Sequence, residues 1–163
     1  MASFKLDDKH YNHLKKKIVE FFEKKLNEKL EEDPSIPIHK YHFDLLIQTK
    51  SKSFGAEIKT FKETSTSPQS WWSYWTKGNK KNLQKELIEK VEKSSLNALE
   101  KGFVAVIEGQ MKEYTEKLKL NEMYLIQEGE QFKDTIKKVL DFLGKKGEIE
   151  KLDNIIFAKI KFK

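Results

Sequence analysis

Residues 41–61, YHFDLLIQTKSKSFGAEIKTF, are the stretch that decides the fold. Asp44 precedes a short apolar run, and a second strand-like segment follows a turn rich in Ser and Lys. Side chains alternate between the two faces of a strand, so Glu57 and Lys59 must project from one face. If the two segments form antiparallel neighbours, Asp44 reaches that same face. We therefore predict two strands that bring two carboxylates and one ammonium together.

Two carboxylates and an ammonium on a rigid sheet are suited to phosphodiester hydrolysis. Carboxylate oxygens bind hard divalent cations such as Mg²⁺. A bound cation polarises a phosphate and lowers the pKa of a bound water, and a lysine can orient that water or offset growing negative charge. The alternative is a solvated strand face on which Glu57 and Lys59 only form ion pairs across the sheet.

The pattern resembles the PD-(D/E)XK nuclease superfamily, in which an Asp begins one strand and an E-x-K motif lies on the next. The matching residues are Asp44 and the triplet Glu57, Ile58 and Lys59. The resemblance implies that Asp44, Glu57 and the backbone carbonyl of Ile58 hold Mg²⁺ or Mn²⁺, and that Lys59 is the catalytic ammonium. It also implies a restriction-endonuclease-like core over residues 7–107.

The same resemblance suggests two further site residues. Many nucleases of this superfamily carry an extra acidic residue on the helix before the sheet, and Glu23 flanks the apolar stripe of the first predicted helix. A solvated glutamate is the alternative. Others present a Gln or Lys from the helix after the E-x-K strand, and Gln84 falls on the apolar face of that predicted helix. Gln84 is therefore expected to orient the site.

All three tryptophans of the chain lie in residues 71–75, WWSYW. Neither helical nor strand periodicity explains this cluster, and it follows a polar segment, residues 63–70, that we interpret as a loop. Bases can stack on aromatic rings while lysines contact phosphates. The candidate nucleic-acid-binding residues are Trp71, Trp72, Trp75, Lys77, Lys80 and Lys81. The alternative is a loop that folds its tryptophans back over the core.

Composition narrows the class of protein. The 163 residues are expected to form one domain, residues 1–163, because aromatic residues reach 12% although charged residues reach 36%. The formal net charge of +6 suits a polyanionic partner. All 32 basic residues are lysines, which excludes bidentate Arg recognition and favours weak sequence specificity. No cysteine is present, which excludes disulfides and Cys-ligated metal sites.

Patterns of polarity predict an α/β domain with a mixed central sheet flanked by helices. Helices are predicted over residues 7–32, 80–101 and 131–143, and strands within residues 41–61 and over residues 103–107, 123–126 and 154–162. Residues 103–107, FVAVI, follow Gly102 and are typical of a buried strand.

Taken together, these patterns predict a metal-dependent endonuclease, with DNA favoured over RNA as the substrate. The main alternative is a basic nucleic-acid-binding module without catalysis, and the third is a basic interaction protein with no nucleic-acid role. Nucleic acid is the expected partner, and a homodimer is compatible with cutting both strands. No apolar run reaches membrane-spanning length and the first residues do not form a signal peptide, so we expect a cytoplasmic protein.

Overall fold

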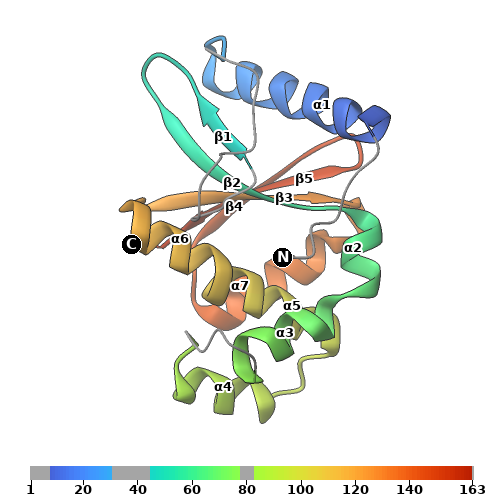
Figure 1. Cartoon of the computed structure of the whole chain (residues 1–163), viewed down its shortest axis with the longest axis vertical. Helices are drawn as coiled ribbons and strands as arrows, with labels where there is room; N and C mark the ends of the chain where they lie inside the picture. Colours follow the sequence, from blue (N-terminus) through green and yellow to red (C-terminus); the bar gives the residue numbers. More distant parts are fainter. Residues whose placement is uncertain (1–7, 31–44, 78–82, 163) are drawn as a thin grey trace.

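A five-stranded mixed sheet with helices on both faces forms the centre of the molecule (Figure 1). The computed structural model describes residues 8–30, 45–77 and 83–162. The strand order is β1-β2-β3-β5-β4. The predicted fold class, α/β with a mixed central sheet, is confirmed.

The sheet begins with the predicted pair of strands. The strands are β1 (Leu45–Gln48), β2 (Ser53–Lys59), β3 (Glu122–Glu128), β4 (Gly147–Leu152) and β5 (Ile155–Lys161). β1 and β2 are antiparallel, β3 is parallel to β2, and β5 is antiparallel to both β3 and β4. The central strands β3 and β5 are apolar on both faces because helices cover both faces.

One face of the sheet is covered by α1 (Asp8–Leu26) (Figure 1). Leu14, Ile18 and Phe22 form its buried stripe, as their spacing predicts. The Phe22 ring makes an edge contact with Tyr124 of β3 at a centroid distance of 4.8 Å. The helix ends at Leu26, earlier than predicted, because Asn27 adopts a left-handed backbone conformation with φ 53°.

The other face is covered by a layer of helices. These are α2 (Phe61–Thr66), α3 (Pro68–Lys77), α4 (Lys85–Glu92), α5 (Ala98–Val104), the π-helix η1 (Ala105–Met111), α6 (Lys112–Leu118), the 3-10 turn η2 (Glu130–Phe132) and α7 (Lys133–Leu143). They enclose the larger hydrophobic core with Met123, Leu125 and Ile156 of the sheet.

The predicted strand over residues 103–107 is wrong. These residues are helical, in α5 and η1, and they lie within a continuous helical run from Ala98 to Leu118. A short apolar run looks the same in a buried strand and in a helix that is buried on every side. The strand parallel to β2 is β3, so the crossover connection is longer than expected.

The two predicted loops and the second long helix also need correction. Residues 63–66 belong to α2 and residues 68–75 belong to α3, with Ser67 between the two helices. The helix predicted over residues 80–101 is interrupted, since α4 ends at Glu92 and α5 begins at Ala98. Asn97 starts the second helix with a capping box, in which its side chain accepts from Glu100 N.

Candidate active site

The side chains of Glu57 and Lys59 project from the same face of β2 and are buried. Phe54, Ala56 and Ile58 pack in the core beneath α1, so alternation directs Glu57 and Lys59 towards the opposite helical layer. Glu57 is 1% exposed and Lys59 is 6% exposed. The prediction of a shared face is therefore confirmed. The alternative is wrong in placing the two side chains in solvent, whereas the purely structural ion pair that it also described is compatible with the geometry.

Two carboxylates and one aromatic ring surround the ammonium group of Lys59. Its Nζ lies 3.5 Å from Glu57 Oε1 and 3.5 Å from Glu63 Oε1. It also lies over the Trp71 ring, 4.7 Å from the ring centroid, in cation–π geometry. A charge this deeply buried is tolerated only with close partners of this kind.

Glu63 reaches the site because α2 begins directly after β2. Thr60 separates the two elements and caps the helix, and its Oγ1 accepts a hydrogen bond from Glu63 N at 3.3 Å. Pro68 then starts α3, at the first helical position that suits a proline. This tight strand–helix–helix path places Glu63 and Trp71 beside Lys59, at the carboxyl end of β2.

Gln127 of β3 is a site residue that sequence analysis missed. The parallel register pairs it with Lys59, and it is fully buried. Its Nε2 donates to Thr64 Oγ1 at 2.8 Å and to the carbonyl of Glu128 at 2.7 Å. Among the described residues its Oε1 has no hydrogen-bond partner. Gln127 directly follows the apolar segment 123–126, and a polar residue at the end of a buried strand is the sequence feature that could have indicated it.

Glu128 closes the edge of the site. Its Oε1 accepts a hydrogen bond from Phe61 N at 3.1 Å, at the start of α2. Its Oε2 lies 2.9 Å from Nε2 of His10, on α1. Glu128 therefore ties both helical layers to the end of β3, next to Gln127.

Part of the predicted site cannot be placed. Asp44, the expected second carboxylate, lies outside the described residues, as do Lys80 and Lys81. Within the described ranges, no group of three His, Asp or Glu side chains has the arrangement of a metal site. Among the described residues, the structure brings the carboxylates of Glu57 and Glu63 to Lys59.

Glu23 and Gln84 do not occupy the positions expected of them. Glu23 belongs to α1, the helix on the opposite face of the sheet from Lys59, and its Oε2 accepts a hydrogen bond from Leu30 N at 3.0 Å. Gln84 is an exposed residue before the first turn of α4, rather than part of an apolar helix face. It was misplaced because the helix begins at Lys85, and Figure 1 shows α4 at the end of the molecule remote from the sheet.

Two of the three tryptophans fill the core. Trp72 and Trp75 are each 6% exposed, so they are not presented for base stacking, in agreement with the alternative of packing over the core. Trp72 Nε1 donates to Glu92 Oε1 at 2.9 Å, and this hydrogen bond lowers the pKa of Glu92. Trp71 is half-buried beside Lys59, and Lys77 is exposed on the last turn of α3.

Comparisons with known proteins identify no relative. No family model, no curated protein and no solved structure matches the chain. Among the described residues, no helix combines the length and apolar character that crossing a membrane requires.

Proposed function

We propose that the protein is a metal-dependent nuclease that hydrolyses phosphodiester bonds of nucleic acid, with DNA favoured over RNA. The observation that carries the proposal is the buried E-x-K pair of Glu57 and Lys59, whose ammonium is shared with Glu63. The pair lies at the carboxyl ends of two parallel strands, where α/β sheets commonly bind ligands. Ionisable groups in such unusual environments cluster at catalytic sites.

The donor set at this site fits a hard divalent cation. Mg²⁺ is often held by one or two carboxylates and completes its shell with waters and substrate phosphate oxygens. Glu57 and Glu63 would hold it, with Asp44 and the Ile58 carbonyl as the further ligands that the sequence resemblance implies. When bound, Mg²⁺ or Mn²⁺ polarises the phosphate and lowers the pKa of a coordinated water.

The chain's own residues account for charge and orientation. The Lys59 ammonium, fixed between two carboxylates, would orient the attacking water or offset the negative charge that develops on the phosphate. Gln127 would take the orienting role that was expected of Gln84. Its amide donates a hydrogen bond to Thr64 and so links α2 to β3. The Trp71 ring packs against the Lys59 ammonium and restricts the movement of that side chain.

A basic nucleic-acid-binding module without catalysis is the second candidate function. Glu57 and Lys59 are almost completely shielded from solvent, which is also what a purely structural ion pair shows. In that case the net charge of +6 would attract the phosphate backbone through lysines alone, with little sequence specificity.

Incubation with plasmid DNA and with RNA, in Mg²⁺ and in EDTA, tests the proposal. We expect cleavage in Mg²⁺ alone, slowed by about 10²-fold or more in Glu57→Gln and in Lys59→Met, because each variant removes a charge from the reacting centre. The matched controls are Glu116→Gln and Lys93→Met, which change exposed residues. Circular dichroism would verify that every variant is folded.

Two results would count against this function. If Glu57→Gln and Lys59→Met cleave as fast as the two controls, the site assignment is wrong. If the wild-type chain binds nucleic acid in a salt-dependent way but cleaves neither DNA nor RNA, the module without catalysis is the better description.

A further inference from the structure

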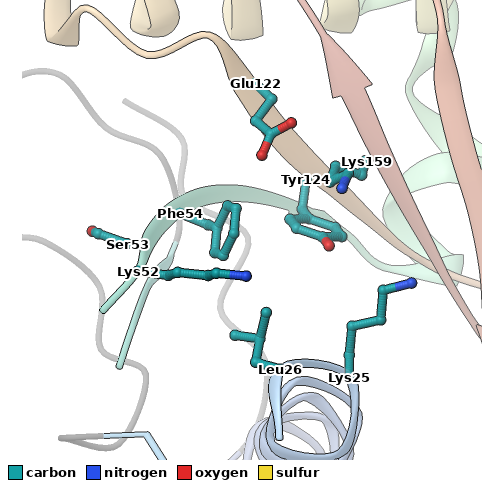
Figure 2. Close-up of a pocket in the computed structure, with 8 residues that line it drawn as sticks. All are labelled: Lys25, Leu26, Lys52, Ser53, Phe54, Glu122, Tyr124 and Lys159. Carbon is teal, nitrogen blue, oxygen red and sulfur yellow. The ribbon is translucent and has the colours of Figure 1, made fainter. Parts of the chain in front are cut away.

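A cavity lies on the opposite face of the sheet from Lys59, beneath the end of α1 (Figure 2). It sits at the beginning of β2 and β3, whereas the candidate active site sits at their ends. Its volume of about 450 Å³ is within the range of small-molecule pockets. The lining residues are Lys25, Leu26, Lys52, Ser53, Phe54, Glu122, Tyr124 and Lys159.

Tyr124 presents its hydroxyl group to this cavity. The residue is 2% exposed, and edge contacts with Phe22 and Phe54 fix its ring. Its hydroxyl makes no hydrogen bond with any residue that the structure describes, and Figure 2 shows it directed into the space between Lys25 and Lys52. Burial, and then the nearby carboxylates of Glu150, Glu122 and Glu148, raise the pKa of Tyr124, so the phenol is protonated at neutral pH and can donate.

The lysines around the cavity differ in how they are paired. Lys25 Nζ lies 2.6 Å from Glu150 Oε2, and Lys159 Nζ lies 3.6 Å from Glu148 Oε2. Lys52 forms no salt bridge within the described part of the chain. The Lys52 ammonium, which interacts electrostatically with Glu28 but forms no salt bridge among the described residues, and the Tyr124 hydroxyl are thus two donors at the cavity, and the Ser53 hydroxyl also lines it.

The other walls restrict what the ligand can be. Phe54 is half-buried and, with Leu26, offers an apolar surface to a flat ring. Glu122 places a carboxylate in the wall, which repels a bare anion but accepts hydrogen bonds from N–H or O–H groups. A ligand with an anionic group, a planar ring and a hydrogen-bond donor would complement these walls.

We propose that this cavity binds a nucleotide unit. Its phosphate would meet Lys52 and the Tyr124 hydroxyl, its base would lie against Phe54 and Leu26, and a sugar hydroxyl or base amino group would donate to Glu122. The unit is either a free mononucleotide or the end of a nucleic-acid strand. Because the cavity lies across the sheet from Lys59, this inference does not depend on the proposed cleavage.

Isothermal titration of the full chain in EDTA tests the inference without any cleavage. The ligands are adenosine 5′-monophosphate, inorganic phosphate and a 5′-phosphorylated single-stranded octanucleotide. We expect saturable binding of the mononucleotide or the octanucleotide, weakened about tenfold in Tyr124→Phe and in Lys52→Gln, since each loses one hydrogen bond to a charged group. Lys50→Gln, on the same turn but outside the cavity, should bind like the wild type.

Binding of the mononucleotide identifies a free nucleotide as the ligand, and binding of the octanucleotide alone identifies a strand end. The inference is overturned if neither binds, or if inorganic phosphate binds as tightly as both. It is equally overturned if Tyr124→Phe, which keeps the ring and its packing, binds like the wild type. If Lys50→Gln and Lys52→Gln weaken ligand binding equally, the lysines act only through nonspecific electrostatic attraction. That result would contradict a specific binding site in the cavity.

Discussion

Lys59 is a single ammonium shared by two carboxylates in a place that solvent barely reaches. Desolvation of such a group is costly, and hydrophobic residues of similar volume often stabilise a fold at least as well. Stability therefore gives little reason for these charges. The proposed chemistry of a cation and a phosphate, in which carboxylates hold the cation and an ammonium offsets charge on the phosphate, would give them a direct role.

The hydrogen bond between Gln127 and Thr64 is expected to stabilise the site. Thr64→Val removes the hydroxyl that accepts from Gln127 Nε2 and keeps the side-chain shape. We expect the free energy of unfolding in urea to fall by about 1–3 kcal/mol, because a buried amide loses a partner. Thr66→Val on the same helix is the control, since its hydroxyl is exposed and bonds carbonyls of its own helix. Equal effects of the two substitutions would contradict this role.

The ionisation of Glu92 should make the free energy of unfolding depend on pH. The hydrogen bond from the Trp72 indole is the main cause that holds the pKa of Glu92 below its ordinary value of 4.5, and Lys101 adds to it. A lowered folded-state pKa contributes stability above the unfolded pKa, and this contribution is lost as the pH falls through the folded pKa. Thermal unfolding of Glu92→Gln should therefore change less than that of the wild type between pH 6 and pH 3, two values chosen to bracket the carboxylate range. Identical pH profiles would show that this hydrogen bond has no effect on stability.

Among the elements, the π-helix η1 depends on a close contact with α3. A Cβ built on Gly109 would lie 2.6 Å from Cδ2 of Trp75. Gly to Ala in an ordinary helix stabilises it by about 0.5–1 kcal/mol. Here Gly109→Ala should instead lower the free energy of unfolding by about 1–3 kcal/mol, because the core must move to admit the methyl group. Chemical denaturation measures the sign, and a gain in stability would contradict the tight packing of η1 on Trp75.

Sequence patterns predicted those elements whose exposure alternates or repeats along one face. The stripe of α1 and the alternation in β2 are such cases, and both are observed. Residues 103–107 have no polar face, because η1 is surrounded by α3, α5 and the sheet, so periodicity could not distinguish strand from helix. Strand β4 was missed, since its charged residues, in the sequence GEIEKL, give little apolar signal at the sheet edge.

The candidate site was predictable only where it is local in sequence. Glu57 and Lys59 share a face by alternation within one strand. Glu63 and Gln127 join them through the turn at Thr60 and through the parallel register of β2 and β3. That register pairs residues almost seventy positions apart, and no local pattern encodes it. Gln127 was not identified from the sequence for this reason, whereas Gln84 was named from its place on a predicted helix.

For the molecule as a whole, the sheet separates two distinct polar centres. The candidate active site lies between the ends of β2 and β3 and the large helical layer, whereas the proposed nucleotide cavity lies under α1. The net charge of +6, whose positive part is carried by lysines alone, would attract the proposed nucleic-acid partner without fixing its sequence. Specific chemistry must then come from the two centres, and the one at Lys59 is the centre on which the proposed function depends.

Binding of Mn²⁺ to the full chain, followed by the electron paramagnetic resonance of the free ion, tests that centre most directly. We expect a site whose dissociation constant rises by about tenfold or more in Glu57→Gln, because a carboxylate ligand is lost. Glu116→Gln should leave it unchanged. If Glu57→Gln binds Mn²⁺ as tightly as the wild type, or the wild type binds none, the cluster of Glu57, Lys59 and Glu63 is not a cation-holding centre.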